Sequence, residues 1–177
     1  MPLSAVLLLD FIGRTEAPGG YEVIYRNRQN TLARPLTQMT LAEVLAAQPG
    51  WEAAHGSSAA GRYQVISATL SGVIEQLGLD AERRFDPGLQ DLIGYTLLQR
   101  RGFDRFIAHE LRLEDFALQL AMEWAAFPVL APMRGAHRRL AAGETYYAGD
   151  RRNRALIAPE RLVGILRTCL SLAEARV

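Results

Sequence analysis

The sequence is poor in the residues that form covalent cross-links and metal centres. Its 177 residues include one cysteine, Cys169, which excludes an intramolecular disulfide and any cysteine-rich metal site. Cys169 lies in the apolar pattern LVGILRTCLSL, so we expect a buried thiol there rather than a nucleophile. Lysine is absent, and all 20 basic residues are arginine. Codon bias explains the absence of lysine as well as any function does, so this absence excludes no class of protein.

The chain also lacks a long hydrophobic run and an excess of charge. No stretch approaches the roughly 18 to 20 apolar residues needed to span a bilayer. The N-terminus has no basic region and Asp10 interrupts its apolar run, so no signal peptide is predicted. We therefore expect a protein made in the cytoplasm, without membrane insertion, that reaches any outside substrate by another route. The formal charge of +1 demands no polyanionic partner.

Motifs for cofactors and nucleic acids are missing. The three histidines, His55, His109 and His137, are isolated and form no H-E-x-x-H pattern, so no metal site is predicted. Neither a G-x-G-x-x-G motif nor a P-loop occurs, and we expect no cofactor. The arginines between positions 134 and 154 follow no helical or strand period, so nucleic-acid binding is not expected.

The patterns that are present predict one mostly helical α+β domain over 1–177, with a small β-element near the N-terminus. The β-element consists of a strand at Tyr21–Asn27, which is rich in β-branched and aromatic residues, and the loop that follows it up to Thr37. Residues 51–62 and 129–153 read as irregular. Apolar stripes and helix-ending residues predict helices over 4–16, 41–48, 63–77, 87–101, 103–110, 114–127 and from Pro159 to the end.

Local signals set several of these helix ends. Ser4 is the expected N-cap of the first helix, and Thr40 with Glu43 matches a capping box. Asp86 followed by Pro87 predicts the start of another helix. That helix is expected to end before Gly102 and to point these residues inward: Leu89, Leu92, Ile93, Thr96 and Leu97.

Glu16 stands out because it extends the apolar stripe of the first helix immediately before Ala-Pro-Gly-Gly. It lies about 40° round the helix from Ile12, with Leu8 a further turn back. Partial burial and the negative end of the helix dipole both favour the protonated carboxyl, which suits a general acid. A solvated glutamate at a helix end is the simpler interpretation of this residue taken alone.

Two further segments have the composition of a ligand site. Ser57–Gln64 combines small residues with Arg62, Tyr63 and Gln64, which suits a sugar or amide ligand, or else a loop leading into a helix. Gly143–Asp150 contains Tyr146 and Tyr147, a pair able to form a lip over a carbohydrate groove.

These three segments together resemble the phage lambda-type endolysins, which are lysozyme-like enzymes that cleave the glycan strand of peptidoglycan. The catalytic helix of the family matches Leu9-Asp10 through Thr15-Glu16. The segment after that helix matches Gly20-Tyr21-Glu22-Val23-Ile24. Ala60-Gly61-Arg62-Tyr63-Gln64 matches the most recognisable motif of the family. Three further matches follow in order: Phe85-x-Pro87-x-x-Gln90-Asp91, Arg101-Gly102 and Trp124-Ala125. The resemblance covers roughly residues 5–130, and extends more loosely to about Leu156.

The resemblance implies a lysozyme-like fold and a lytic transglycosylase, in which Glu16 is the catalytic acid and base. Hydrolysis with Glu16 as acid and Glu22 as base is the alternative chemistry. An inactive binding or structural component of a phage-like particle is the alternative of another class. The substrate-binding residues expected on the same grounds are Tyr21, Tyr25, Ser58, Arg62, Tyr63, Gln64, Tyr146 and Tyr147.

The expected partner is the peptidoglycan glycan strand, bound by a monomer. Without a signal peptide, the protein would need a holin or a phage-like particle to reach the periplasm or cell wall. The sequence departs from the family in three places. Thr15-Glu16-Ala17 stands where the family has Ser-Glu-Gly, and the segment from Leu36 to Leu45 replaces the upper-lip sequence of the lambda protein. The helix after Ala158 is a C-terminal extension, 158–177, without a counterpart.

Overall fold

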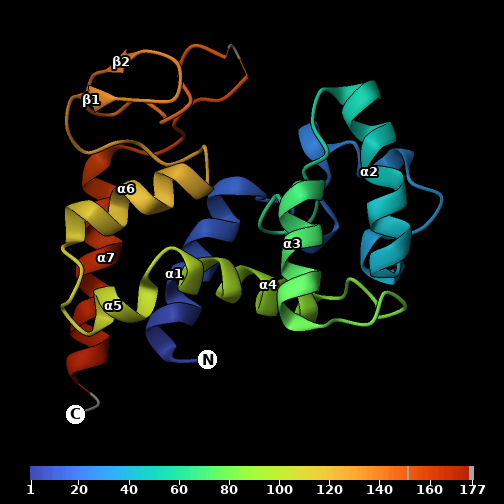
Figure 1. The fold of residues 1–177 in the computed structure, drawn as a ribbon, viewed down its shortest axis with the longest axis horizontal. Coiled ribbons are helices and arrows are strands. Elements are labelled where there is room, and N and C mark those ends of the chain that lie inside the picture. The colour runs from blue at the N-terminus through green and yellow to red at the C-terminus, as the bar shows by residue number, and fades with distance from the viewer. Residues whose placement is uncertain (151, 176–177) are drawn as a thin grey trace. The chain divides into compact units, whose positions relative to one another are not determined.

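The computed structural model describes residues 1–150 and 152–175, and over these the chain is mostly helical with one small antiparallel sheet. The chain forms two compact units. We call 1–15 with 97–177 the terminal unit, and 16–96 the central unit. In chain order (Figure 1), the helices and strands are α1 Leu3–Glu16, α2 Leu41–His55, α3 Ser67–Leu77, α4 Pro87–Arg100, α5 Phe103–Ile107, α6 Leu113–Glu123, β1 Met133–Arg134, β2 Arg139–Leu140 and α7 Pro159–Glu174.

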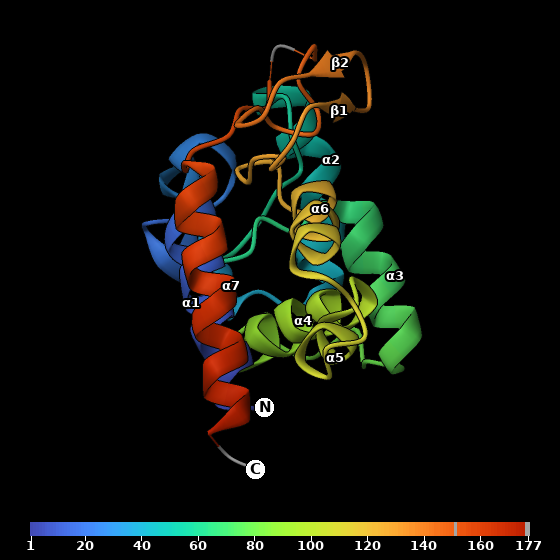
Figure 2. The same ribbon diagram turned by 90° about the vertical axis from the view of Figure 1, so that its left-hand side faces the viewer.

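The terminal unit is held together by helices from both ends of the chain. Phe106 and Phe116 stack at 4.5 Å between ring centroids, which joins α5 to α6. Helix α7 lies alongside α1 (Figure 2), and the Cys169 thiol donates to the Ser4 carbonyl oxygen at 3.4 Å. Leu162, Leu166 and Cys169 are fully buried on one face of α7. The buried thiol predicted for Cys169 is therefore confirmed.

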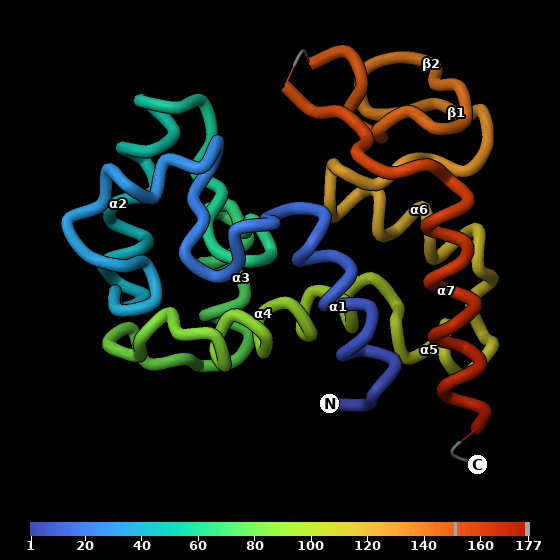
Figure 3. The backbone as a smooth tube through the Cα atoms, turned by 180° about the vertical axis from the view of Figure 1, so that it is seen from behind, coloured from blue at the N-terminus to red at the C-terminus, as the bar shows by residue number. Residues whose placement is uncertain are grey.

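The central unit contains α2, α3 and the first part of α4. Helices α2 and α3 lie side by side (Figures 1 and 3). The predicted capping box is present, because the Glu43 amide donates to Thr40 and the Thr40 amide donates to the Glu43 carboxylate. Asp86 also caps α4 as predicted, accepting from the Leu89 amide at 2.8 Å. Gly78 ends α3 in the left-handed conformation, as expected from its position.

The predicted strand at Tyr21–Asn27 is wrong. The segment forms short 3₁₀ turns, Gly20–Glu22 and Tyr25–Asn27, in which Arg26 and Asn27 have positive φ values of 59° and 56°. Two such residues cannot continue a strand. Only Ile24 pairs with another segment, through an isolated bridge to Ala60. The two-stranded sheet lies instead at β1 and β2, in a segment predicted to be irregular.

Several predicted helix ends are also wrong. Ser4 lies inside α1 rather than capping it. Helix α2 continues through Pro49 to His55, and the segment predicted from Tyr63 becomes helical only at Ser67. Helix α6 ends at Glu123 rather than near Phe127. Leu92, expected to point inward, is 36% exposed. Within the described residues no helix combines the length and hydropathy that a membrane crossing requires.

Candidate functional site

Glu16 is the last residue of α1, and its side chain is partly buried. The preceding stripe is as predicted, since Leu8 and Ile12 are both fully buried. Ala17 is also buried, but Pro18 and Gly19 are exposed, and Gly20 has a φ of 85° that a residue with a side chain rarely adopts. The sequence therefore places a carboxylate where a buried helix meets an exposed turn.

The Ala-Gly-Arg-Tyr-Gln segment forms a tight turn in the central unit. Ala60 pairs with Val65 across this turn and with Ile24 on its other side. The Gly61 amide donates to the Val23 carbonyl oxygen at 2.7 Å, and the Gln64 amide donates back to Gly61 at 3.1 Å. These backbone bonds attach the turn to the segment that follows Glu16 in the chain.

The Gln90 side chain connects this turn to α4. Gln90 is 1% exposed, and its oxygen accepts from the Arg62 amide at 2.8 Å. Its nitrogen donates to the carbonyl oxygens of Tyr21, at 3.1 Å, and Phe85, at 2.9 Å. A buried primary amide with both of its polar atoms bonded fixes the three segments that it contacts.

Asp91, the next residue, gathers two of the predicted binding residues. Its carboxylate accepts from the Tyr63 hydroxyl at 2.7 Å and from the Tyr21 hydroxyl at 3.0 Å and 3.2 Å. The Arg62 guanidinium lies 5.0 Å from the centre of the Tyr21 ring, within reach of a cation–π interaction. Burial raises the pKa of Tyr63, and the Asp91 carboxylate adds to this effect. Tyr21, Arg62, Tyr63 and Asp91 thus form one polar cluster.

The other predicted residues of the central unit support the turn. Gln64 has a φ of 48°, and its side-chain nitrogen donates to the Gly61 carbonyl oxygen at 2.8 Å. Ser58 is buried, and its hydroxyl accepts from the Ser67 amide at 3.3 Å. The Tyr25 amide donates to the Ala59 carbonyl oxygen at 3.0 Å. The Tyr25 ring is partly exposed and lies 5.5 Å from the Arg26 guanidinium.

Glu22 is bound to the segment before α2. Its carboxylate accepts hydrogen bonds from both the amide and the hydroxyl of Thr37, the first at 3.2 Å. Thr37 lies in the 3₁₀ turn Leu36–Gln38, whose Leu36 side chain is fully buried. The carboxylate thus holds two short 3₁₀ segments together.

Tyr146 and Tyr147 belong to the terminal unit, whereas the cluster around Asp91 belongs to the central unit. Their rings meet edge to face at 5.2 Å, and the Tyr147 hydroxyl donates to the Met122 carbonyl oxygen at 2.6 Å. Burial raises the pKa of Tyr147. These contacts hold Tyr147 against the end of α6.

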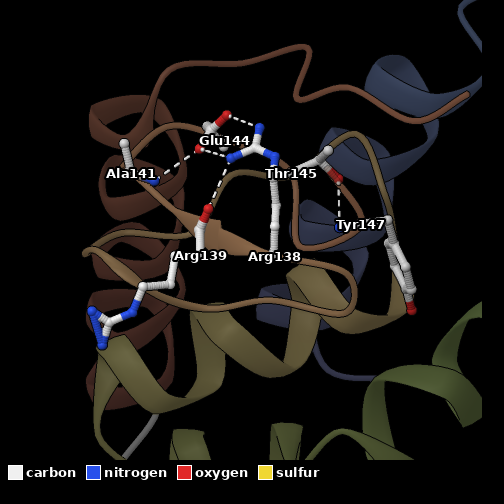
Figure 4. Close-up of polar contacts among 6 residues, drawn as sticks. All are labelled: Arg138, Arg139, Ala141, Glu144, Thr145 and Tyr147. Atoms are coloured by element: carbon white, nitrogen blue, oxygen red, sulfur yellow. Dashed lines mark hydrogen bonds and ion pairs between the residues drawn. The ribbon is translucent and has the colours of Figure 1, made fainter. Parts of the chain in front are cut away.

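The loop that carries the two tyrosines is braced by an ion pair. Arg138 and Glu144 are joined by two hydrogen bonds of 3.1 Å and 2.6 Å (Figure 4). Glu144 also accepts from the Ala141 amide at 2.8 Å. Arg138 holds the pKa of Glu144 below its ordinary value. The Tyr147 amide contacts the Thr145 hydroxyl, whose proton is donated to Ala125.

Sequence reasoning identified Tyr21, Arg62 and Tyr63 but assigned no role to Asp91 or Gln90. Asp91 is 70 residues from Tyr21 and 28 from Tyr63, so no local spacing indicates their contact. The signal that singles them out is the Gln90-Asp91 pair near the start of α4, which belongs to the Phe85-x-Pro87-x-x-Gln90-Asp91 match. No group of three potential metal ligands occurs among the described residues.

Comparison with known proteins assigns no relative. No family model, no curated protein and no solved structure matches the chain.

Proposed function

We propose that this protein cleaves the glycan strand of peptidoglycan between N-acetylmuramic acid and N-acetylglucosamine, as a lytic transglycosylase. The observation that supports this most is a difference between two carboxylates. Glu16, at the end of α1, is partly buried, whereas the carboxylate of Glu22 is already hydrogen-bonded to Thr37. A reaction that needs one carboxylate fits this arrangement better than one that needs two.

Glu16 serves as both acid and base in this mechanism. Its protonated carboxyl donates to the glycosidic oxygen as the bond from C1 of the muramic acid breaks. The resulting carboxylate then takes the proton of the 6-hydroxyl group while that oxygen bonds to C1, which gives a 1,6-anhydro product. Partial burial and the helix C-terminus favour the protonated carboxyl at the start.

The cluster around Asp91 supplies an aromatic and hydrogen-bonding surface for this substrate. The Tyr21 ring is partly exposed and its orientation is fixed by Asp91. The Arg62 side chain, next to that ring, is also partly exposed. Fixed aromatic rings and directional donors suit sugar hydroxyl and N-acetyl groups. The same reasoning supports Tyr25 as a substrate-binding residue, because its ring is also partly exposed.

The test is zymography on peptidoglycan with wild-type protein and the Glu16→Gln variant. Wild-type protein is expected to clear the gel, and the variant to lose clearing by at least about two orders of magnitude, since it cannot transfer the proton. Equal clearing by both would overturn the role of Glu16. No clearing by a folded wild-type protein would favour the alternative of an inactive binding or structural component.

Mass spectrometry of the digest separates the two chemistries. Anhydro ends, lighter by one water than reducing ends, are expected for the transglycosylase. Reducing ends, together with loss of activity in a folded Glu22→Gln variant, would assign a hydrolase in which Glu22 is the base. The Glu22→Gln variant is the matched control for Glu16→Gln, because each removes one carboxylate charge at nearly constant volume.

A further inference from the structure

A groove on the terminal unit has no role in the cleavage reaction described above. It has a volume of about 420 Å³, within the range of small-ligand sites. One helical face of α1, with the start of α7 and the residues before it, encloses the groove. Its lining consists of Leu7, Asp10, Phe11, Arg14, Thr15, Leu156, Ile157, Arg161 and Ile165.

The groove has an apolar floor and a positively charged rim. Leu7, Phe11 and Ile165 are only partly buried, so their apolar surface remains accessible. Arg14 is paired with Asp10 at 2.9 Å, but the arginine side chain is 78% exposed. The Arg161 guanidinium lies 5.9 Å from the centre of the Phe11 ring and forms no ion pair with a described residue. Two arginines against one aspartate leave an excess positive charge.

This chemistry suits a short peptide that carries free carboxylates and small apolar side chains. An exposed arginine over an aromatic ring offers a forked donor for a carboxylate next to an apolar surface. The floor accommodates the methyl groups of alanine. The stem peptides attached to the muramic acid of peptidoglycan have this composition.

Helix α1 relates the groove to Glu16. Thr15 lines the groove and Glu16 follows it, but Glu16 points about 140° round the helix from Phe11. Glu16 therefore lies on a different face of α1 from the residues that line the groove.

We propose that this groove binds the acidic stem peptide of peptidoglycan while Glu16 acts on the glycan strand to which that peptide is attached. The inference rests on the proposed function, since it assigns a second part of the same substrate. Arg161 holds a stem carboxylate, and Phe11 with Leu7 and Ile165 contacts the alanine side chains.

The experiment compares two substrates. One is purified peptidoglycan, and the other is the same glycan after an amidase has removed its stem peptides. Wild-type protein is expected to cleave the stem-bearing strands faster, and Arg161→Gln to reduce that preference about tenfold or more, as for loss of a charged hydrogen bond. The matched control is Arg167→Gln, an exposed arginine of α7 outside the groove, which should leave the preference unchanged.

Calorimetric titration with the peptides released by the amidase tests the groove directly. Wild-type protein and Arg167→Gln should bind them, and Arg161→Gln should bind at least about tenfold more weakly. Cleavage with the same substrate preference in all three proteins would overturn the role of the groove and leave the proposed function intact. Peptide binding that depends on Arg161, without any cleavage, would overturn the proposed function and retain the groove. Absence of peptide binding in the wild-type protein would overturn the groove assignment.

Discussion

Gly61 occupies a position that no other residue fits. Its φ is 75°, and a Cβ atom built there would lie 2.3 Å from the Gln90 side-chain oxygen. That oxygen cannot withdraw, because Gln90 is buried and bonded to Arg62, Tyr21 and Phe85. We predict that Gly61→Ala lowers the free energy of unfolding by about 2 to 4 kcal/mol, through backbone strain and overpacking. Urea unfolding followed by circular dichroism measures this.

The matched control for Gly61→Ala is Gly164→Ala. Gly164 lies inside α7, and a Cβ atom there would meet nothing within 4 Å. The same substitution should therefore raise the free energy of unfolding by about 0.5 to 1 kcal/mol, because alanine favours the helix. A Gly61→Ala variant as stable as wild type would show that the Gln90 amide does not hold the turn rigidly.

Tyr63 makes the stability depend on alkaline pH. Burial, and next the Asp91 carboxylate, raise the pKa of Tyr63 above its ordinary value of 10.0. The folded protein therefore holds this proton more tightly than the unfolded chain does. The stability that results is complete below about pH 10 and is lost as the pH rises above it.

We predict that Tyr63→Phe lowers the free energy of unfolding at neutral pH by about 1 to 3 kcal/mol, the contribution of a hydrogen bond to a charged group. The variant should also lose less stability than wild type as the pH rises above about 10, since the titrating group is gone. Urea unfolding at a series of pH values measures both effects. Parallel curves for the two proteins would contradict the assignment of this pH dependence to Tyr63.

At the scale of helices and strands, the sequence predicted the elements whose signals are local. The capping box at Thr40 and the Asp86-Pro87 start of α4 both depend on residues within one helical turn, and both are present. The strand at 21–27 failed because β propensity needs a neighbouring strand to pair with. Ile24 finds only the single bridge to Ala60.

Helix α2 shows the opposite error. Proline usually ends a helix, but α2 continues past Pro49 and Trp51, which is 8% exposed, to His55. Burial of the Trp51 side chain offsets the backbone hydrogen bond lost at Pro49, and helix propensity alone does not include the free energy of that burial.

The candidate site was likewise only partly predictable from local sequence. Arg62, Tyr63 and Asp91 all lie in sequence motifs, but the contacts of Asp91 with the two tyrosines join distant segments, which no local signal indicates.

At the scale of the whole molecule, the chain passes between the two units at the end of one helix and inside another. One boundary falls at the last residue of α1, between Thr15 and Glu16, and the other falls inside α4, between Thr96 and Leu97. A helix that continues across a boundary resists local breakage, because its hydrogen bonds form cooperatively. We therefore expect the two units to unfold in a single transition, although each has buried residues of its own.

The two tryptophans report on one unit each, Trp51 on the central unit and Trp124 on the terminal unit. We predict that Trp51→Phe and Trp124→Phe variants, followed by fluorescence in urea, each unfold in one transition. Adding Leu166→Ala, which removes a fully buried side chain from α7, should cost about 2 to 5 kcal/mol. That loss should move the midpoint reported by Trp51 as far as the one reported by Trp124.

The single thiol provides a third probe of the same transition. Cys169 is fully buried, and burial raises its pKa to about 12, so a thiol reagent should label it only when the terminal unit opens. If Leu166→Ala shifts the Trp124 signal and speeds Cys169 labelling but leaves the Trp51 signal in place, the units unfold separately. Separate unfolding would mean that α4 breaks at the boundary between Thr96 and Leu97.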